Sequence, residues 1–126
     1  MALAAKVNFT DFLDRDLNDG FSGGEIKRSE LLQLMAQDPD LMLFDEPESG
    51  VDLENIALIG NTISGLLQRN FNYHSEINQN SAHRRRNKMG LIITHTGYIL
   101  NYVPADRGQV LFNGVMACRG NPQEIF

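Results

Sequence analysis

The chain has 126 residues, of which 42% are hydrophobic and 21% are charged, which suits one modest globular domain. Its single cysteine, Cys118, excludes an internal disulfide and a multi-cysteine metal site. The net charge is −5, and no apolar run reaches the roughly 20 residues that a membrane-spanning helix needs. We therefore expect a cytoplasmic protein that binds no nucleic acid and does not insert directly into a membrane.

The first well-defined element is a helix predicted over residues 22–37. Ser22 can cap it, and Glu25 stands three places later, which is the spacing of a capping box. Asp38-Pro39 ends the helix, because the residue before a proline avoids helical geometry. Residues 1–20 are predicted to be a polar lead-in with short apolar patches.

Two short apolar runs predict buried strands of a parallel sheet, at residues 41–44 and 91–94. Between them, Asp52 can cap a second helix. Its apolar residues recur at helical spacing: Leu53, Ile56, Ile59, Ile63 and Leu66 or Leu67. The strand–helix–strand order indicates an α/β fold.

Residues 69–90 have no hydrophobic periodicity and carry five basic residues against one acidic residue, Glu76. We predict a flexible basic insertion here. A docking surface for an acidic partner is the alternative, and metal binding by His74 and His83 is a weaker one because nothing fixes their geometry.

The last third of the chain predicts a short helix and a hairpin. Residues 98–103 form the helix, closed by Pro104. In the hairpin, strands at 109–112 and 115–118 flank Asn113-Gly114, which is a preferred two-residue turn.

Three clusters carry residues suited to chemistry, although each has a plain structural interpretation when taken alone. Ser22-Gly23-Gly24-Glu25 opens a helix, where bare amides and the helix dipole favour an anion such as a terminal phosphate. Asp45 and Glu46 follow a buried strand; Asp45 suits Mg²⁺, and Glu46 suits the water that attacks a γ-phosphate. His95 follows the next strand and could sense that phosphate. The structural interpretations are a capped helix, solvated turn acids and a structural histidine.

The order of these clusters resembles the ABC ATPase family. Ser22 to Glu25 corresponds to its signature motif, Asp45-Glu46 to the Walker B carboxylates, Ser49 to Asp52 to the D-loop, and His95 to the switch histidine. The resemblance covers roughly residues 16–126 apart from the insertion.

A closer resemblance is to the SufC family of ABC ATPases, and archaeal members above all. It rests on a signature that ends in Glu25, on Glu48-Ser49-Gly50-Val51-Asp52, and on Ile92 to His95 with Tyr98-Ile99-Leu100. That family powers iron–sulfur cluster assembly, so the resemblance implies SufB- and SufD-like scaffold subunits and a second ATPase subunit arranged head to tail.

The resemblance implies a role for each matching residue. Asp45 would coordinate Mg²⁺, Glu46 and His95 would be catalytic, and the remaining positions would bind ATP held by the opposite subunit or link the two sites: Ser22, Gly23, Gly24, Glu25 and Asp52.

The chain matches only the C-terminal half of such an ATPase, because it contains no G-x-x-x-x-G-K-[ST] loop. The expected fold is an α/β partial nucleotide-binding domain, with the end of the helical subdomain at 1–38 and part of a RecA-like subdomain at 39–126. We expect ATP and Mg²⁺ to bind only with a complementary Walker A half, and the chain alone to be inactive. The alternatives are part of a transporter ATPase that works with a permease, and a non-catalytic fragment that binds partners.

Overall fold

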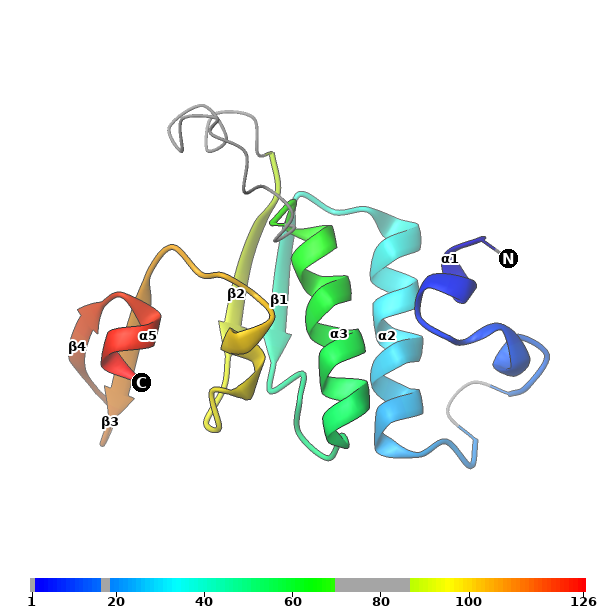
Figure 1. Cartoon of the computed structure of the whole chain (residues 1–126), viewed down its shortest axis with the longest axis horizontal. Helices are drawn as coiled ribbons and strands as arrows, with labels where there is room; N and C mark the ends of the chain where they lie inside the picture. Colours follow the sequence, from blue (N-terminus) through cyan, green and yellow to red (C-terminus); the bar gives the residue numbers. More distant parts are fainter. Residues whose placement is uncertain (1, 17–18, 70–86) are drawn as a thin grey trace.

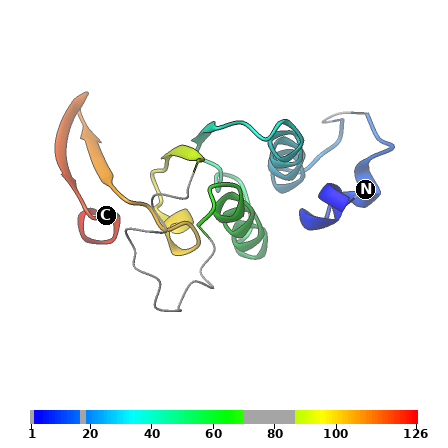
Figure 2. The ribbon, with the colours of Figure 1, turned by 90° about the horizontal axis from the view of Figure 1, so that it is seen from above.

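The computed structural model describes residues 2–16, 19–69 and 87–126. Its centre is a parallel pair of strands, β1 (Leu41–Asp45) and β2 (Met89–Ile93), with the helices α2 (Gly23–Gln37) and α3 (Leu53–Leu66) beside it (Figure 1). The 3₁₀ helix η2 (Tyr98–Asn101) follows β2. Seen from above, α3 and η2 lie on the same side of the strands (Figure 2).

Smaller elements flank this centre at both ends (Figure 1). At the N-terminal end, α1 (Ala2–Lys6) packs on α2 and is followed by the 3₁₀ helix η1 (Thr10–Phe12). At the other end, the antiparallel strands β3 (Gly108–Phe112) and β4 (Val115–Gly120) contact the short helix α5 (Pro122–Ile125). The element α5 was not predicted, since it has only four residues.

Both long helices begin at the predicted caps. The Ser22 and Glu25 side chains form a complete capping box at the start of α2, and Asp52 caps α3 by accepting a hydrogen bond from the Asn55 amide. The α2 helix ends at Asp38, which is left-handed at φ +48° and donates its amide to the Leu34 carbonyl. Side-chain capping and the Asp38-Pro39 stop therefore determine these helix boundaries locally.

The parallel sheet is confirmed, with Leu41 opposite Met89 and Asp45 opposite Ile93. The second strand begins at Met89, two residues earlier than predicted, so Met89 and Gly90 belong to the sheet and not to an insertion. A Cβ at residue 90 would lie 2.6 Å from a Leu67 methyl carbon, which explains a glycine inside a strand. Residues 70–86 of the predicted flexible insertion, with His74 and His83, lie outside the described residues.

The prediction that both strands are buried on both faces was wrong. Met42 and Phe44 are 1% and 6% exposed and join the core. Large apolar residues at the alternate positions are mostly exposed: Leu41, Leu43, Met89, Leu91 and Ile93. The reason is that α3 and η2 cover one face of the pair, and within the described residues nothing covers the other face.

The N-terminal segment is part of the core, which corrects its prediction as a polar lead-in. Ala4, Val7 and Phe9 are at most 4% exposed. The rings of Phe9, Phe12 and Phe21 pack together, with centroids 5.0–5.6 Å apart. The Arg28 guanidinium ties this segment to α2 by donating to the Asn8 carbonyl at 2.9 Å. Short patches separated by polar residues hid this cluster from periodicity analysis.

The hairpin is confirmed, and its turn residues Asn113 and Gly114 have φ of +48° and +75°, as a type I′ turn requires. The predicted helix at 98–103 is a shorter 3₁₀ helix. In the described part of the chain, no helix combines the length and apolar character needed to cross a bilayer.

Candidate functional site

The predicted site residues gather at one edge of the sheet. The strands β1 and β2 end there, and α2 and α3 begin there, at the lower edge of Figure 1. Parallel strands place their carboxyl ends together, and the loops at these ends are where open α/β sheets bind ligands.

Glu46 and His95 are brought into direct contact at this edge. The His95 Nδ1 lies 2.7 Å from the Glu46 Oε1. The Glu46 amide also donates to the Ile93 carbonyl at 2.9 Å, so the backbones after the two strands are joined. Both side chains stay accessible, at 39% exposed for Glu46 and 65% for His95. The pair can therefore contact a ligand from solvent.

The backbone of Glu46 is left-handed, with φ +45°. For a residue other than glycine, the left-handed backbone region is less stable by about 1 kcal/mol or more, so this conformation is sparsely populated. It turns the chain sharply after Asp45, the last residue of β1, whose side chain is exposed.

Beneath this pair lies Glu48, a residue to which sequence analysis assigned no role. It is 5% exposed, and its Oε1 accepts hydrogen bonds from the hydroxyls of Thr94 and Thr96. The only available signal was the presence of two threonines flanking His95, because nothing in the sequence shows that they face residue 48.

The start of α2 has a closed part and an open part. The Ser22 amide donates to the Glu25 carboxylate at 2.7 Å, and the Glu25 amide donates to the Ser22 hydroxyl at 3.4 Å. The Ser22 amide is the main reason that the pKa of Glu25 is lowered. Within the described residues, the amides of Gly23 and Gly24 have no protein acceptor, and Gly23 is exposed whereas Gly24 is buried. An exposed amide at a helix start, such as that of Gly23, can bind an anionic oxygen.

The start of α2 contacts the loop between β1 and α3. A Cβ at residue 23 would lie 2.7 Å from the Gly50 carbonyl oxygen, whereas one at residue 24 would be 3.7 Å from the Asn55 side chain. Gly23 is therefore required by packing against Gly50.

Asp52 is engaged in capping and does not point freely into the site. Its carboxylate accepts from the Asn55 amide at 2.9 Å and from the Asn55 side chain at 2.8 Å. These hydrogen bonds, the backbone one first, lower the pKa of Asp52. A link from Asp52 to a second site would have to use a carboxylate that already holds α3.

Asp45 suits an open cation site, because its side chain is exposed at the end of β1. Within the described residues, no three His, Cys, Asp or Glu side chains gather closely enough for a closed metal site. Mg²⁺ commonly uses one or two carboxylates together with substrate phosphates, and the exposed Asp45 at the end of β1 fits such an open arrangement.

Comparison with known proteins finds relatives that match most of this chain along part of their own length. No protein-family model matches the chain. It is 36% identical over 110 residues to a probable ATP-dependent transporter, ycf16, of Cyanidium caldarium, and 31% identical over 112 residues to a probable ATP-dependent transporter of Synechocystis. A probable ABC transporter ATP-binding protein of Streptococcus pyogenes is 31% identical over 111 residues. These matches cover 87–89% of this chain but only 37% of each relative.

The fold agrees too. A nucleotide-free ATP-binding cassette from an ABC transporter superposes with a TM-score of 0.66 over 95% of this chain and 40% of the cassette, at 23% identity. The chain is homologous to ABC ATPases. It has part of the ATP-binding cassette fold, and the predicted α/β class and family resemblance are confirmed at that level.

Proposed function

We propose that this ABC ATPase homologue supplies one part of a composite site for ATP hydrolysis. Asp45 coordinates Mg²⁺, Glu46 polarises the attacking water, and His95 contacts the γ-phosphate. The start of α2, at Ser22, Gly23, Gly24 and Glu25, binds the nucleotide held by an opposite subunit, and Asp52 helps to link two such sites.

The contact between Glu46 and His95 is the observation that carries the proposal. A carboxylate only accepts hydrogen bonds, so the His95 Nδ1 donates to Glu46 and the Nε2 is left for a ligand. A carboxylate held beside an imidazole at a strand end can orient a water for in-line attack on a phosphate. Bare amides at the start of α2 supply donors of the type that binds phosphate oxygens.

The phosphate-binding loop comes from a segment outside these 126 residues, which contain no G-x-x-x-x-G-K-[ST] sequence. Without it, the carboxylates of Asp45 and Glu46 repel a polyanion. We expect no turnover by the chain alone. Calorimetry with Mg-ATP should detect no tight binding, and tight binding would contradict a shared site.

The process served is iron–sulfur cluster assembly in the cytoplasm, as for SufC-like ATPases. The supporting features are the signature that ends in Glu25 and the sequence from Ser49 to Asp52. The partners are SufB- and SufD-like scaffold subunits and a second ATPase subunit arranged head to tail.

A transporter ATPase is the second candidate, because relatives at 31–36% identity are named as a probable ATP-dependent transporter or a probable ABC transporter ATP-binding protein. A pull-down from the native host separates the two. Recovery of scaffold subunits would support cluster assembly, and recovery of a permease would support transport. If neither is recovered, the result would favour a non-catalytic fragment that binds other partners.

The decisive variant is Glu46→Gln, measured with the remaining part of a homologous cassette added in trans. We expect turnover to fall by about a hundredfold or more, since the carboxylate that polarises water is lost, while nucleotide binding remains. Glu54→Gln, an exposed acid in the first turn of α3, is the matched control and should leave turnover unchanged. Equal turnover in Glu46→Gln and the parent would remove Glu46 from its role.

A further inference from the structure

We propose that Glu48 is a positioning residue for His95. Its buried carboxylate fixes the turn that carries the imidazole, so that His95 meets Glu46. The catalytic consequence rests on the proposed function, but the geometric claim can be tested without ATP.

Glu48 is a buried carboxylate. In the described part of the chain, it is the only carboxylate that is at least nine-tenths buried. A buried carboxylate is costly unless hydrogen bonds stabilise it. Both hydrogen bonds come from one short segment, the hydroxyls of Thr94 and Thr96, while Oε2 has no protein partner. The Glu48 side chain therefore acts on that segment specifically.

The Thr94 and Thr96 hydroxyls each direct their proton toward Glu48. A threonine hydroxyl has one proton, so when it donates to Glu48 its lone pairs face other donors. The Thr94 hydroxyl accepts from the Gly97 amide at 2.9 Å, and the Thr96 hydroxyl lies 3.5 Å from the Tyr98 amide. Glu48 thus orients two hydroxyls that in turn hold two backbone amides of the turn.

His95 lies between these two threonines in the chain. Its neighbours on both sides are tied to one buried carboxylate, which limits the backbone at residue 95. The imidazole is 65% exposed and gains little restraint from packing. Hydrogen bonds to a charged acceptor are the stronger kind, so they can hold the turn against solvent.

The test compares Glu48→Met with Glu48→Gln in the 126-residue chain by NMR. Methionine fills the space but accepts no strong hydrogen bond, whereas glutamine keeps an amide oxygen in place of Oε1. The readout is the nuclear Overhauser contact between the His95 ring and the Glu46 methylenes, assigned with a His95→Asn variant. We expect the contact in the parent and in Glu48→Gln, and its loss in Glu48→Met.

The control for general loosening is Ser64→Ala. Ser64 is another buried polar residue, 2% exposed, and its hydroxyl donates to the Arg69 carbonyl at 2.6 Å within the segment that ends α3. This variant should lose stability and keep the contact between His95 and Glu46. The proposal is overturned if folded Glu48→Met keeps that contact, or if Ser64→Ala loses it as well.

A milder pair covers the case in which Glu48→Met does not fold. Thr96→Val removes one hydroxyl at nearly constant volume, and Thr96→Ser keeps it. We expect the His95–Glu46 contact to weaken in the valine variant and to survive in the serine variant. An unchanged contact in Thr96→Val would overturn the proposal.

The activity arm separates this inference from the proposed function. In the reconstituted ATPase, Glu48→Met should lower kcat by about tenfold to a hundredfold through misplacement of His95, and Glu48→Gln should recover most of it. Affinity for ADP, which lacks the γ-phosphate that His95 contacts, should be unchanged, and a parallel loss of ADP affinity would contradict a positioning role. If the parent shows no turnover, the proposed function fails, whereas the NMR comparison still decides the geometric claim.

Discussion

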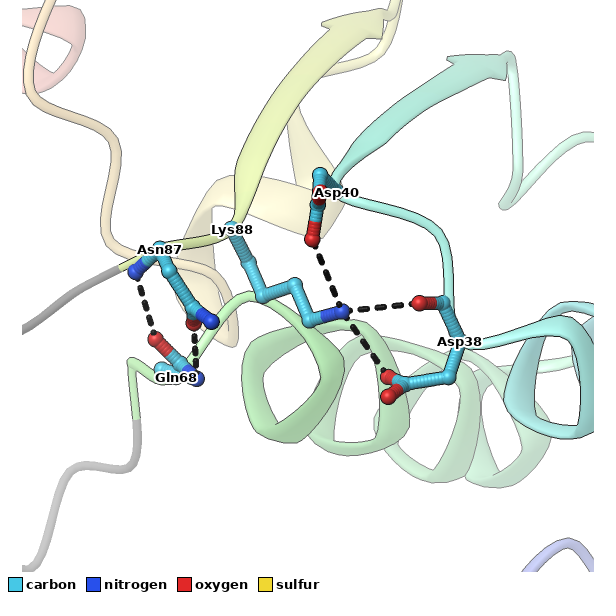
Figure 3. Close-up of polar contacts among 5 residues, drawn as sticks. All are labelled: Asp38, Asp40, Gln68, Asn87 and Lys88. Carbon is cyan, nitrogen blue, oxygen red and sulfur yellow. Dashed lines mark hydrogen bonds and ion pairs between the residues drawn. The ribbon is translucent and has the colours of Figure 1, made fainter.

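The two edges of the β1–β2 sheet treat charged groups in opposite ways. At the amino edge, Lys88 is only 9% exposed in its side chain and donates to the Asp38 carbonyl at 2.8 Å (Figure 3). It also pairs with the carboxylates of Asp38 at 3.0 Å and Asp40 at 3.4 Å. One ammonium thus joins the end of α2, the start of β1 and the start of β2.

A second pair of contacts closes the same edge. The Gln68 Nε2 donates to the Asn87 Oδ1 at 2.7 Å, and the Asn87 backbone amide donates to the Gln68 Oε1 at 3.1 Å (Figure 3). Arg69 donates to the Pro104 carbonyl at 2.8 Å and pairs with Asp106. Two of the five basic residues in the predicted insertion therefore stabilise the fold internally.

The carboxyl edge has the opposite character. Asp45 is exposed, Glu46 and His95 face solvent together, and two amides at the start of α2 have no acceptor in the described part of the chain. At the amino edge the charged groups described above are paired within the protein, whereas at the carboxyl edge Asp45, Glu46 and His95 keep capacity for a ligand. This does not hold for every acid at the carboxyl edge, since Glu25 and Asp52 are engaged in capping hydrogen bonds.

The largest expected effect comes from adding one methyl group at the carboxyl edge. Gly23→Ala should lower the free energy of unfolding by about 1–3 kcal/mol, because its Cβ would lie 2.7 Å from the Gly50 carbonyl and a backbone must move. Gly24→Ala, whose Cβ would be 3.7 Å from Asn55, is the matched control and should be neutral or slightly stabilising. Denaturant unfolding checks both, and equal values would contradict close packing at Gly23.

A smaller effect is expected when the amino edge loses its cation. Lys88→Met should lower the unfolding temperature by leaving Asp38 and Asp40 without their shared partner. Lys27→Met is the control, because the Lys27 side chain is more exposed than that of Lys88 and its pair with Glu30 is longer, at 3.8 Å, so this variant should change little.

The stabilisation supplied by Lys88 depends on pH. The hydrogen bond to Asp38 is the main cause of the raised pKa of Lys88. The stabilising contribution of charged Lys88 is therefore fully present below the pKa of an unfolded lysine, about 10.4. It is lost as the pH rises through the higher pKa of Lys88 in the folded chain. The difference in unfolding temperature between the parent and Lys88→Met should shrink above about pH 10; a constant difference would argue against this ion pair.

The smallest effect is expected at the cap of α3. Asp52 has a lowered pKa, so its stabilisation is present above the unfolded value of about 3.9 and is lost as the pH falls through the folded value. Asp52→Asn can still cap α3 and should lose less stability on acidification, whereas Asp52→Ala should be destabilised already at pH 7. Thermal unfolding between about pH 2 and pH 7 measures this, and equal acid sensitivity in the parent and Asp52→Asn would contradict it.

The sequence predicted the elements whose signals are local. Caps at Ser22 and Asp52, the Asn113-Gly114 turn and two apolar runs each carry their information within a few residues. The position of His95 after a strand also followed, because parallel strands end at a common edge. The division of the chain between residues 38 and 39 stays a prediction.

The rest depends on contacts between distant residues. The buried N-terminal residues Ala4 and Val7 show no periodic pattern, and the exposed face of β1 depends on which layers cover it. Gly23 and Gly50 approach closely although they are 27 positions apart in the chain. Glu48 binds two threonines that are 46 and 48 positions away. No spacing rule reveals contacts over such separations.

The left-handed backbone of Glu46 has a consequence for how this segment can change over generations. Glycine adopts φ +45° without steric cost, so the substitution that best relaxes the backbone also deletes the carboxylate beside His95. Stability and the proposed chemistry therefore favour different residues at position 46. Glu46→Gly would relax the backbone and remove the proposed catalytic carboxylate in the same step.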